Sequence, residues 1–92
     1  MSLDTKYLKD PDAVLDYMFD WTDWLASGET IISHTITAET GIVVDSSTES
    51  AGKVTVWLSG GTAGENYKVA CLIVTSAGRT DERTIWIKVV ER

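Results

Sequence analysis

The alternation of residues along Lys53–Ser59 constrains the fold of this chain more than any other feature. Val54, Val56 and Leu58 alternate with polar residues and with Trp57 in this run. Successive side chains of a β-strand point to opposite faces of a sheet, so the run predicts a strand with one buried and one outward face. Trp57 falls on the outward face, where a solvated sheet usually carries polar side chains.

Four further runs have the same β-branched character, and turn-forming residues separate them. The predicted strands are Thr30–Ala38, Ile42–Asp45, Tyr67–Thr75 and Thr84–Val90. Polar and glycine-containing segments are expected to form the connections, and they lie at 45–52, 60–64 and 76–79. This spacing predicts an all-β fold of about seven short strands, either an antiparallel β-sandwich or a small barrel.

Tyr67 opens the penultimate predicted strand and follows Gly64 closely. This is the position of the tyrosine corner of immunoglobulin-like domains, in which the hydroxyl bonds to upstream backbone. The sequence therefore favours an immunoglobulin-like sandwich. Cys71 is the single cysteine, so no intrachain disulfide can form. It shares a strand face with Tyr67, and we expect it to be a small buried hydrophobic residue.

Residues 1–27 differ in composition from residues 28–92. They carry six acidic and two basic residues and five of the eight aromatic residues, whereas all seven glycines lie in the second segment. We interpret residues 1–27 as an acidic, aromatic-rich N-terminal arm and residues 28–92 as the β-sandwich body.

Two structures are expected within the arm. Asp10 and Pro11 are suited to the N-cap and first position of a helical turn, and Tyr17–Trp21 looks extended. Two roles remain open for the arm. Trp21, Trp24 and Leu25 could plug one open end of the sandwich, or part of residues 1–20 could dock on a neighbouring subunit.

The composition provides few groups for catalysis, metal binding or nucleic-acid binding. The net charge of −6 provides no basic stripe for a nucleic-acid backbone, and no apolar run reaches the roughly 18 residues of a membrane span. With one His and one Cys, we expect no metal site, no cofactor and no catalytic residues. His34 lies in a β-branched run, is expected to be a packed or half-exposed residue, and has no second titratable group at a fixed spacing. The chain is therefore predicted not to be an enzyme.

The outward strand faces are unusually apolar. If Tyr67 and Cys71 point inward, Leu72 and Val74 point outward, and Trp86 projects outward from the next strand. Such a row indicates either cover by the arm or burial against another protein, and aromatic residues are common anchors of interfaces. The predicted interface residues are Tyr17, Phe19, Trp21, Trp57, Leu72, Val74 and Trp86.

Several segments resemble a known family when they are taken in order. They are Lys9–Tyr17, Asp20–Trp21, Trp24–Leu25, Gly28–Ile31, Leu58–Tyr67 and Thr75–Arg83. From about Lys9 to Arg92 the chain resembles small virion proteins of tailed bacteriophages and prophages, described as fiber–tail adaptor-like with an immunoglobulin-like fold. The resemblance implies a structural role in the virion, contacts with head, neck, tail or fiber proteins, and assembly in the bacterial host cytoplasm.

Two functions therefore compete at this point. The first is a structural adaptor that joins virion parts through protein–protein contacts, as a homo-oligomer or ring in the particle. The second is a carbohydrate- or surface-binding sandwich that uses Trp21, Trp57 or Trp86 as a stacking platform. The adaptor predicts apolar surface that is buried on other chains, whereas the sugar binder predicts a monomer with an open tryptophan.

Overall fold

The structure, a computed structural model, describes residues 5–91 of the chain. This part contains seven β-strands and no helix. The strands are β1 (Thr5–Lys9), β2 (Leu15–Asp20), β3 (Ile31–Ala38), β4 (Ile42–Ser50), β5 (Lys53–Gly60), β6 (Asn66–Thr75) and β7 (Thr80–Val89).

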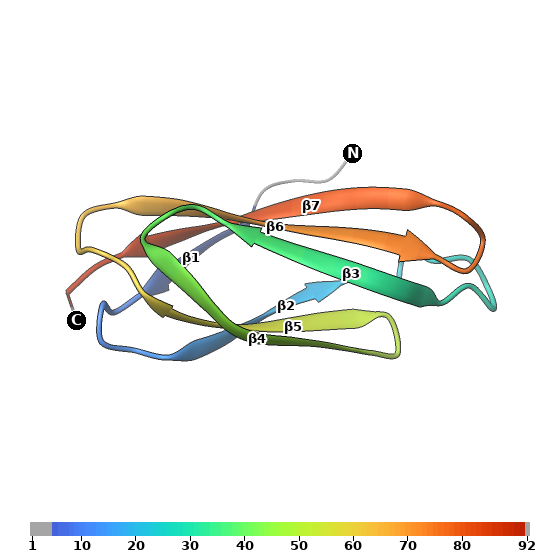
Figure 1. Cartoon of the computed structure of the whole chain (residues 1–92), viewed down its shortest axis with the longest axis horizontal. Coiled ribbons are helices and arrows are strands. Elements are labelled where there is room, and N and C mark those ends of the chain that lie inside the picture. Colours follow the sequence, from blue (N-terminus) through green and yellow to red (C-terminus); the bar gives the residue numbers. More distant parts are fainter. Residues whose placement is uncertain (1–4, 92) are drawn as a thin grey trace.

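The strands form two sheets that pack face to face, with β1, β7, β6 and β3 in one layer and β2, β5 and β4 in the other (Figure 1). The β1–β7 pair is parallel, and the other four strand pairs are antiparallel. The prediction of an all-β sandwich is confirmed. If the strands are lettered A to G in chain order, the sheets share the BED and CFG groupings of the immunoglobulin constant-type sandwich, but strand A pairs with G here.

The core lies between the two sheets and follows the period-2 pattern of the strands. Val54, Val56 and Leu58 of β5 are fully buried, as the alternation predicts. Cys71 of β6 is also fully buried and unpaired, so its inward orientation is confirmed. Burying one such large apolar side chain stabilises the fold by roughly 1.5–3 kcal/mol, so these strands hold the two layers together.

The predicted arm is part of the sandwich in the region that the structure describes. β1 pairs with β7 in the four-stranded sheet, and β2 pairs with β5 in the three-stranded sheet. The division into a separate arm at 1–27 and a body at 28–92 is therefore corrected for residues 5–20. Residues 1–4 of that segment lie outside the described residues. Three aromatic side chains of the segment, Tyr17, Phe19 and Trp21, are buried in the core.

The expected helical turn at Asp10 is a tight turn between β1 and β2. The Asp12 N–H donates to Asp10 Oδ1 at 2.8 Å, and the Ala13 N–H donates to the Asp10 carbonyl at 3.1 Å. An aspartate side chain that bonds to backbone two residues later favours a turn over a helix. Pro11 fits this turn because it needs no amide hydrogen.

One other expectation about strands is corrected. The polar segment after Asp45 continues β4 to Ser50, because an edge strand can direct hydroxyl side chains to water. A register shift between Ile31 and Ser33 places Ile32 on the outside, where it is 64% exposed.

Tyr67 closes one end of the sandwich. Its hydroxyl accepts a hydrogen bond from the Thr62 backbone N–H at 2.9 Å, the upstream contact that a tyrosine corner requires. Gly41 (φ 111°) and Gly61 (φ 97°) lie against the Tyr67 ring, and a Cβ atom on Gly41 would come within 2.7 Å of that ring. Both glycines are therefore needed for backbone conformation and for space.

Candidate interface surfaces

Three of the seven predicted interface residues lie in the core. Tyr17, Phe19 and Trp21 are 7%, 3% and 0% exposed. Tyr17 and Phe19 alternate with exposed residues along β2, which pairs in register with β5. Side chains this deeply buried offer no surface to a partner, so the expected interface role of these three residues is corrected to a core role. Their spacing of two residues was the signal for this.

Trp57 lies on the outer face of the three-stranded sheet and is 43% exposed. Its cross-strand neighbours are Asp16 on β2 and Ser46 on β4. Met18 and Val43 point to the same side and are also exposed. We call this surface, which centres on Met18, Val43 and Trp57, the Trp57 face. Large apolar side chains that gather on an outer sheet face are a typical mark of a contact surface.

Leu72, Val74 and Trp86 lie on the outer face of the four-stranded sheet, as predicted. Leu72 is 36% exposed, whereas Val74 and Trp86 are half-buried. Trp86 stands between Lys6 of β1 and Lys68 of β6, which are its partners in the strand register. We call this surface, which centres on Leu72, Val74 and Trp86, the Trp86 face.

The described part of the predicted arm does not lie over either face. β1 extends the four-stranded sheet at its edge, beyond β7, and β2 belongs to the opposite sheet. Figure 1 shows both strands within their layers rather than across the outside of a layer. Leu72 and Trp57 therefore keep their exposure in the folded chain, and cover by residues 5–27 does not explain their apolar character.

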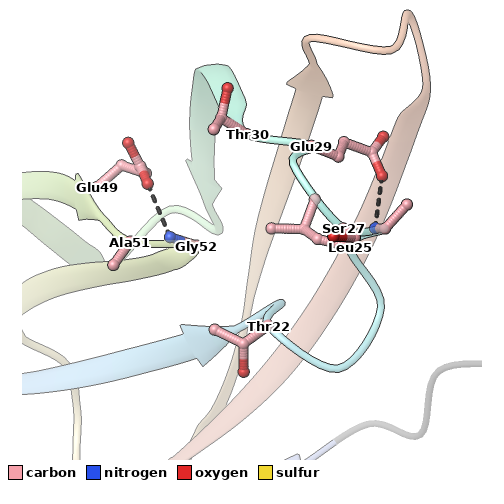
Figure 2. A pocket seen from close by; sticks show the side chains of 9 residues that line it. Thr22, Leu25, Ser27, Glu29, Thr30, Glu49, Ala51 and Gly52 are labelled. Carbon is pink, nitrogen blue, oxygen red and sulfur yellow. Dashed lines mark hydrogen bonds between the residues drawn. The ribbon is translucent and has the colours of Figure 1, made fainter.

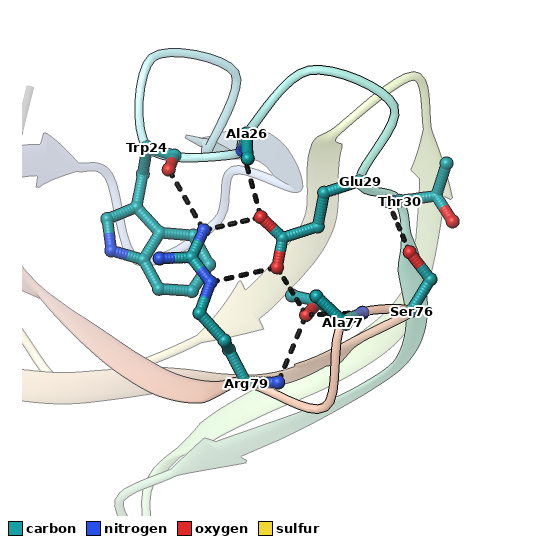
Figure 3. Close-up of polar contacts among 8 residues, drawn as sticks. Trp24, Ala26, Glu29, Thr30, Ser76, Ala77 and Arg79 are labelled. Atoms are coloured by element: carbon teal, nitrogen blue, oxygen red, sulfur yellow. Dashed lines mark hydrogen bonds and ion pairs between the residues drawn. The ribbon is translucent and has the colours of Figure 1, made fainter.

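The loop between β2 and β3 is fastened to the β6–β7 hairpin by Glu29 and Arg79 (Figure 3). The Arg79 side chain donates to both carboxylate oxygens of Glu29 and also to the Trp24 carbonyl, and its guanidinium carbon lies 3.9 Å from the centre of the Trp24 ring. Thr75 and the Ala26 backbone N–H donate to the same carboxylate. These contacts hold Trp24 against the end of the sandwich.

These contacts strongly favour the ionised form of the Glu29 carboxyl group. Hydrogen bonds from Arg79, Thr75 and Ala26 lower the pKa of the Glu29 carboxyl to about 2 from its usual 4.5. The same pair raises the pKa of Arg79 above its usual value. Sequence reasoning missed this pair, because no local pattern connects Arg79 with a glutamate 50 positions earlier.

A second arginine stacks on the other tryptophan of this region. The Arg83 guanidinium carbon lies 4.2 Å from the Trp21 ring centre, and Arg83 donates to the Asp20 carbonyl at 2.6 Å. Cys71 is the register partner of Arg83, but its thiol points into the core, where burial raises its pKa to about 11. A thiol of this kind is a packing group and not a nucleophile at neutral pH.

One open hollow lies between the β2–β3 loop and the β4–β5 hairpin (Figure 2). It has a volume of about 560 Å³ and is lined by Thr22, Leu25, Ala26, Ser27, Glu29, Thr30, Glu49, Ala51 and Gly52. Both carboxylates in it already accept backbone N–H groups, Glu29 from Ala26 and Glu49 from Gly52. Both carboxylates that line the hollow are therefore engaged in hydrogen bonds within the fold.

Groups for chemistry are sparse in residues 5–91. His34 bonds to Ser47 at 3.1 Å across the β3 and β4 edges and has no acidic partner. No group of three His, Cys, Asp or Glu residues in this range could hold a metal ion. None of its elements is a helix long and apolar enough to cross a membrane.

The comparisons with known proteins agree with a role in contacts. The model of a family described as podophage GP4 fiber-tail adaptor protein gp77 matches residues 9–88. No curated protein matches the chain. Because the matched segment spans most of the 92 residues, the chain belongs to the podophage GP4 fiber-tail adaptor protein gp77 family.

Proposed function

We propose that this chain is a structural virion component that joins tail and fiber parts of a podophage particle through protein–protein contacts. The observation that carries the proposal is the pair of outer faces with exposed apolar residues on a member of an adaptor family. Trp57 on one face and Leu72 on the other are the exposed anchors. A sandwich with two contact faces on opposite sides is suited to bridge two neighbours.

The family and the sparse chemistry support a binding role without catalysis. The chain then acts by holding partners in place, and it needs no cofactor, nucleic acid or membrane. Assembly would occur in the cytoplasm of the host bacterium, and the protein would remain in the finished particle. Aromatic and aliphatic side chains at the centre of each face are expected to supply most of the binding energy.

Particles assembled without this chain test the proposal. They should retain a tail but lack fibers in negative-stain electron micrographs, and purified chain should restore the fibers. Trp57→Glu chain should fail to restore them, because a charge would be buried in the contact. Ala77→Glu is the matched control, since Ala77 is exposed in the connection between β6 and β7, outside both faces. Particles that keep their fibers without the chain would contradict the proposal.

The alternative, a carbohydrate-binding sandwich, has one observation in its favour. Trp57 is exposed on a sheet face and could stack on a sugar ring. Trp21 is unsuited to this role because it is fully buried. Calorimetric titration with the surface polysaccharide of the host would favour the alternative if it detected binding that Trp57→Ser abolishes.

A further inference from the structure

β3 is an edge strand with one unpaired side. It pairs with β6, and in the part of the chain that the structure describes no strand pairs with its other side. β4, an edge strand of the other sheet, lies next to it across the sandwich (Figure 1). The unpaired side of an edge strand presents a row of backbone N–H and C=O groups. β3 can therefore accept a further strand.

Backbone hydrogen bonds at the two ends of β3 indicate which of its residues face the unpaired side. The Glu39 N–H donates to the Lys68 carbonyl at 3.1 Å, and the Ser76 N–H donates to the Thr30 carbonyl at 2.8 Å. Even positions of β6 therefore bond toward β3, because alternate residues of an antiparallel strand bond to opposite sides. In the register these even positions are opposite odd positions of β3. The backbone groups on the unpaired side consequently belong to His34, Ile36 and Ala38.

The other three edge strands carry features that discourage pairing with a further strand. Short length, charged side chains and bulges are the usual features of this kind. β1 has five residues, two of them lysines, and β2 has two aspartates among six residues. β4 has a register shift after Val44 and carries Asp45 and Glu49. β3 has eight residues without lysine, carboxylate or proline, and its register shift is confined to its first residues. It is therefore the most open edge of the described sandwich.

The side chains along β3 indicate which sequence a docked strand would need. His34, Ile36 and Ala38 are half-buried and point inward, since their register partners on β6 are fully buried. Thr35 and Thr37 point outward and are exposed. A strand that pairs with β3 continues the same alternation of side chains beside them. The edge thus suits an extended segment with apolar residues at every second position and polar residues between them.

We propose that the unpaired side of β3 binds an extended segment of a neighbouring virion protein, which joins the four-stranded sheet as a further strand. In this mode of recognition main-chain hydrogen bonds provide affinity, and alternate side chains provide specificity. The edge borders the Trp86 face, because Thr35 is the register partner of Leu72. One partner can therefore cover Leu72 and pair with β3. The inference rests on the proposed function and specifies how the partner on the Trp86 face is bound.

Hydrogen exchange of the full chain tests the added strand, with purified tail particles assembled without the chain as the probe. Mass spectrometry with fragmentation to single residues follows the amides of β3. In the free chain the amides of His34, Ile36 and Ala38 should exchange rapidly, whereas those of Thr35 and Thr37 should be protected by β6. In particle-bound chain the first three should exchange at least about tenfold more slowly, because a partner strand then accepts their hydrogen bonds.

The outcomes separate this inference from the proposed function. A chain that does not bind the particles would contradict both. Binding without a change at the three amides would overturn the added strand and leave the adaptor role intact. Slower exchange of the same amides in concentrated free chain would show that a second copy occupies the edge, and it would overturn the assignment to another virion protein.

A proline on the unpaired side provides a second test. Ile36→Pro removes an amide hydrogen that β6 does not use, and edge strands tolerate proline at such positions. It should weaken co-sedimentation with the particles by about tenfold, because one hydrogen bond is lost and the proline ring obstructs the incoming strand. Ile36→Val is the matched control, since it alters the same side chain but keeps the amide hydrogen, and it should bind as the native chain does.

Circular-dichroism melts establish which of these variants fold. Ala38→Pro makes the same backbone change two residues further along the edge and replaces Ile36→Pro if that variant does not fold. A folded proline variant that binds the particles as tightly as the native chain would overturn the proposal.

Discussion

At the scale of single residues, Glu29 and Cys71 show how burial and bonding determine what a side chain can do. The Glu29 carboxylate is 2% exposed and accepts hydrogen bonds from three residues, so it acts as a structural anion. Cys71 is fully buried among apolar side chains, so its thiol stays protonated and packs as a small hydrophobic group. Both residues are engaged in holding the fold together, which fits the proposed role in protein–protein contacts.

Glu29→Gln should reduce stability in a pH-dependent manner. The folded-state pKa of Glu29 is about 2, below its usual 4.5. Its stabilising effect is therefore complete above pH 4.5 and disappears as the pH falls toward 2. The difference in urea midpoint between the native chain and Glu29→Gln should be large at pH 7 and shrink toward zero near pH 2.

The control for this prediction is Glu82→Gln, which removes an exposed carboxylate on β7. It should shift the midpoint little at any pH. A difference between the native chain and Glu29→Gln that stays constant from pH 7 to pH 2 would contradict the assigned role of the carboxylate.

Cys71→Ser should destabilise the fold by about 1–3 kcal/mol, because it buries a hydroxyl without a hydrogen-bond partner. Urea unfolding followed by tryptophan fluorescence measures this loss. The native thiol should also resist a thiol reagent until the chain unfolds. Rapid labelling of the folded chain would show that Cys71 is accessible and that the face assignment of β6 is wrong.

At the scale of elements, β2 shows that the N-terminal part belongs to the sandwich. Its alternating pattern puts Tyr17 and Phe19 into the core and Met18 outside. The pairing with β5 runs without a shift from Leu15 to Asp20. The strand is therefore one wall of the core, and its loss would expose the inner face of β5.

Phe19→Ala should cost about 3–5 kcal/mol of unfolding free energy, the usual range for a buried phenylalanine. Met18→Ala is the matched control on the same strand, because Met18 is 47% exposed and should change stability by less than about 0.5 kcal/mol. Chemical denaturation of both variants measures the contrast. Similar small losses in both would mean that β2 is not part of the core.

The strands that could be predicted from the sequence are those with strong local alternation. β5 and β6 carry a period-2 pattern of apolar residues, and this pattern depends only on neighbours in the chain. The sheet membership of β1 and β2 depends on partners far along the sequence, β7 and β5, so composition alone suggested a separate arm. β4 was underestimated after Asp45 because serine and threonine favour both loops and exposed edge strands.

Only part of the candidate surfaces could be predicted from the sequence. Outward positions such as Trp57 and Leu72 follow directly from strand alternation, and both are exposed. The charges around them come from strands that meet only in the fold, as Lys6 and Lys68 do on either side of Trp86. The Glu29–Arg79 pair likewise joins residues that are distant in sequence, and no local pattern indicates it.

At the scale of the whole molecule, the chain is one sandwich with two outer faces that point in opposite directions (Figure 1). Its described residues offer sparse groups for chemistry, whereas each face exposes large apolar side chains. An adaptor needs this arrangement, because it must bind neighbours on more than one side without changing them. In the proposed function, the fold is the rigid spacer and the two faces bind the partners.

An electron cryo-microscopy map of a podophage tail that contains this chain would test that arrangement most directly. We expect density for neighbouring protein over both Trp57 and Leu72, with more than about 1,000 Å² buried in total at each stable contact. A map in which the chain is attached only by loops, while both outer sheet faces remain open to solvent, would contradict the assignment of these faces as the contact surfaces.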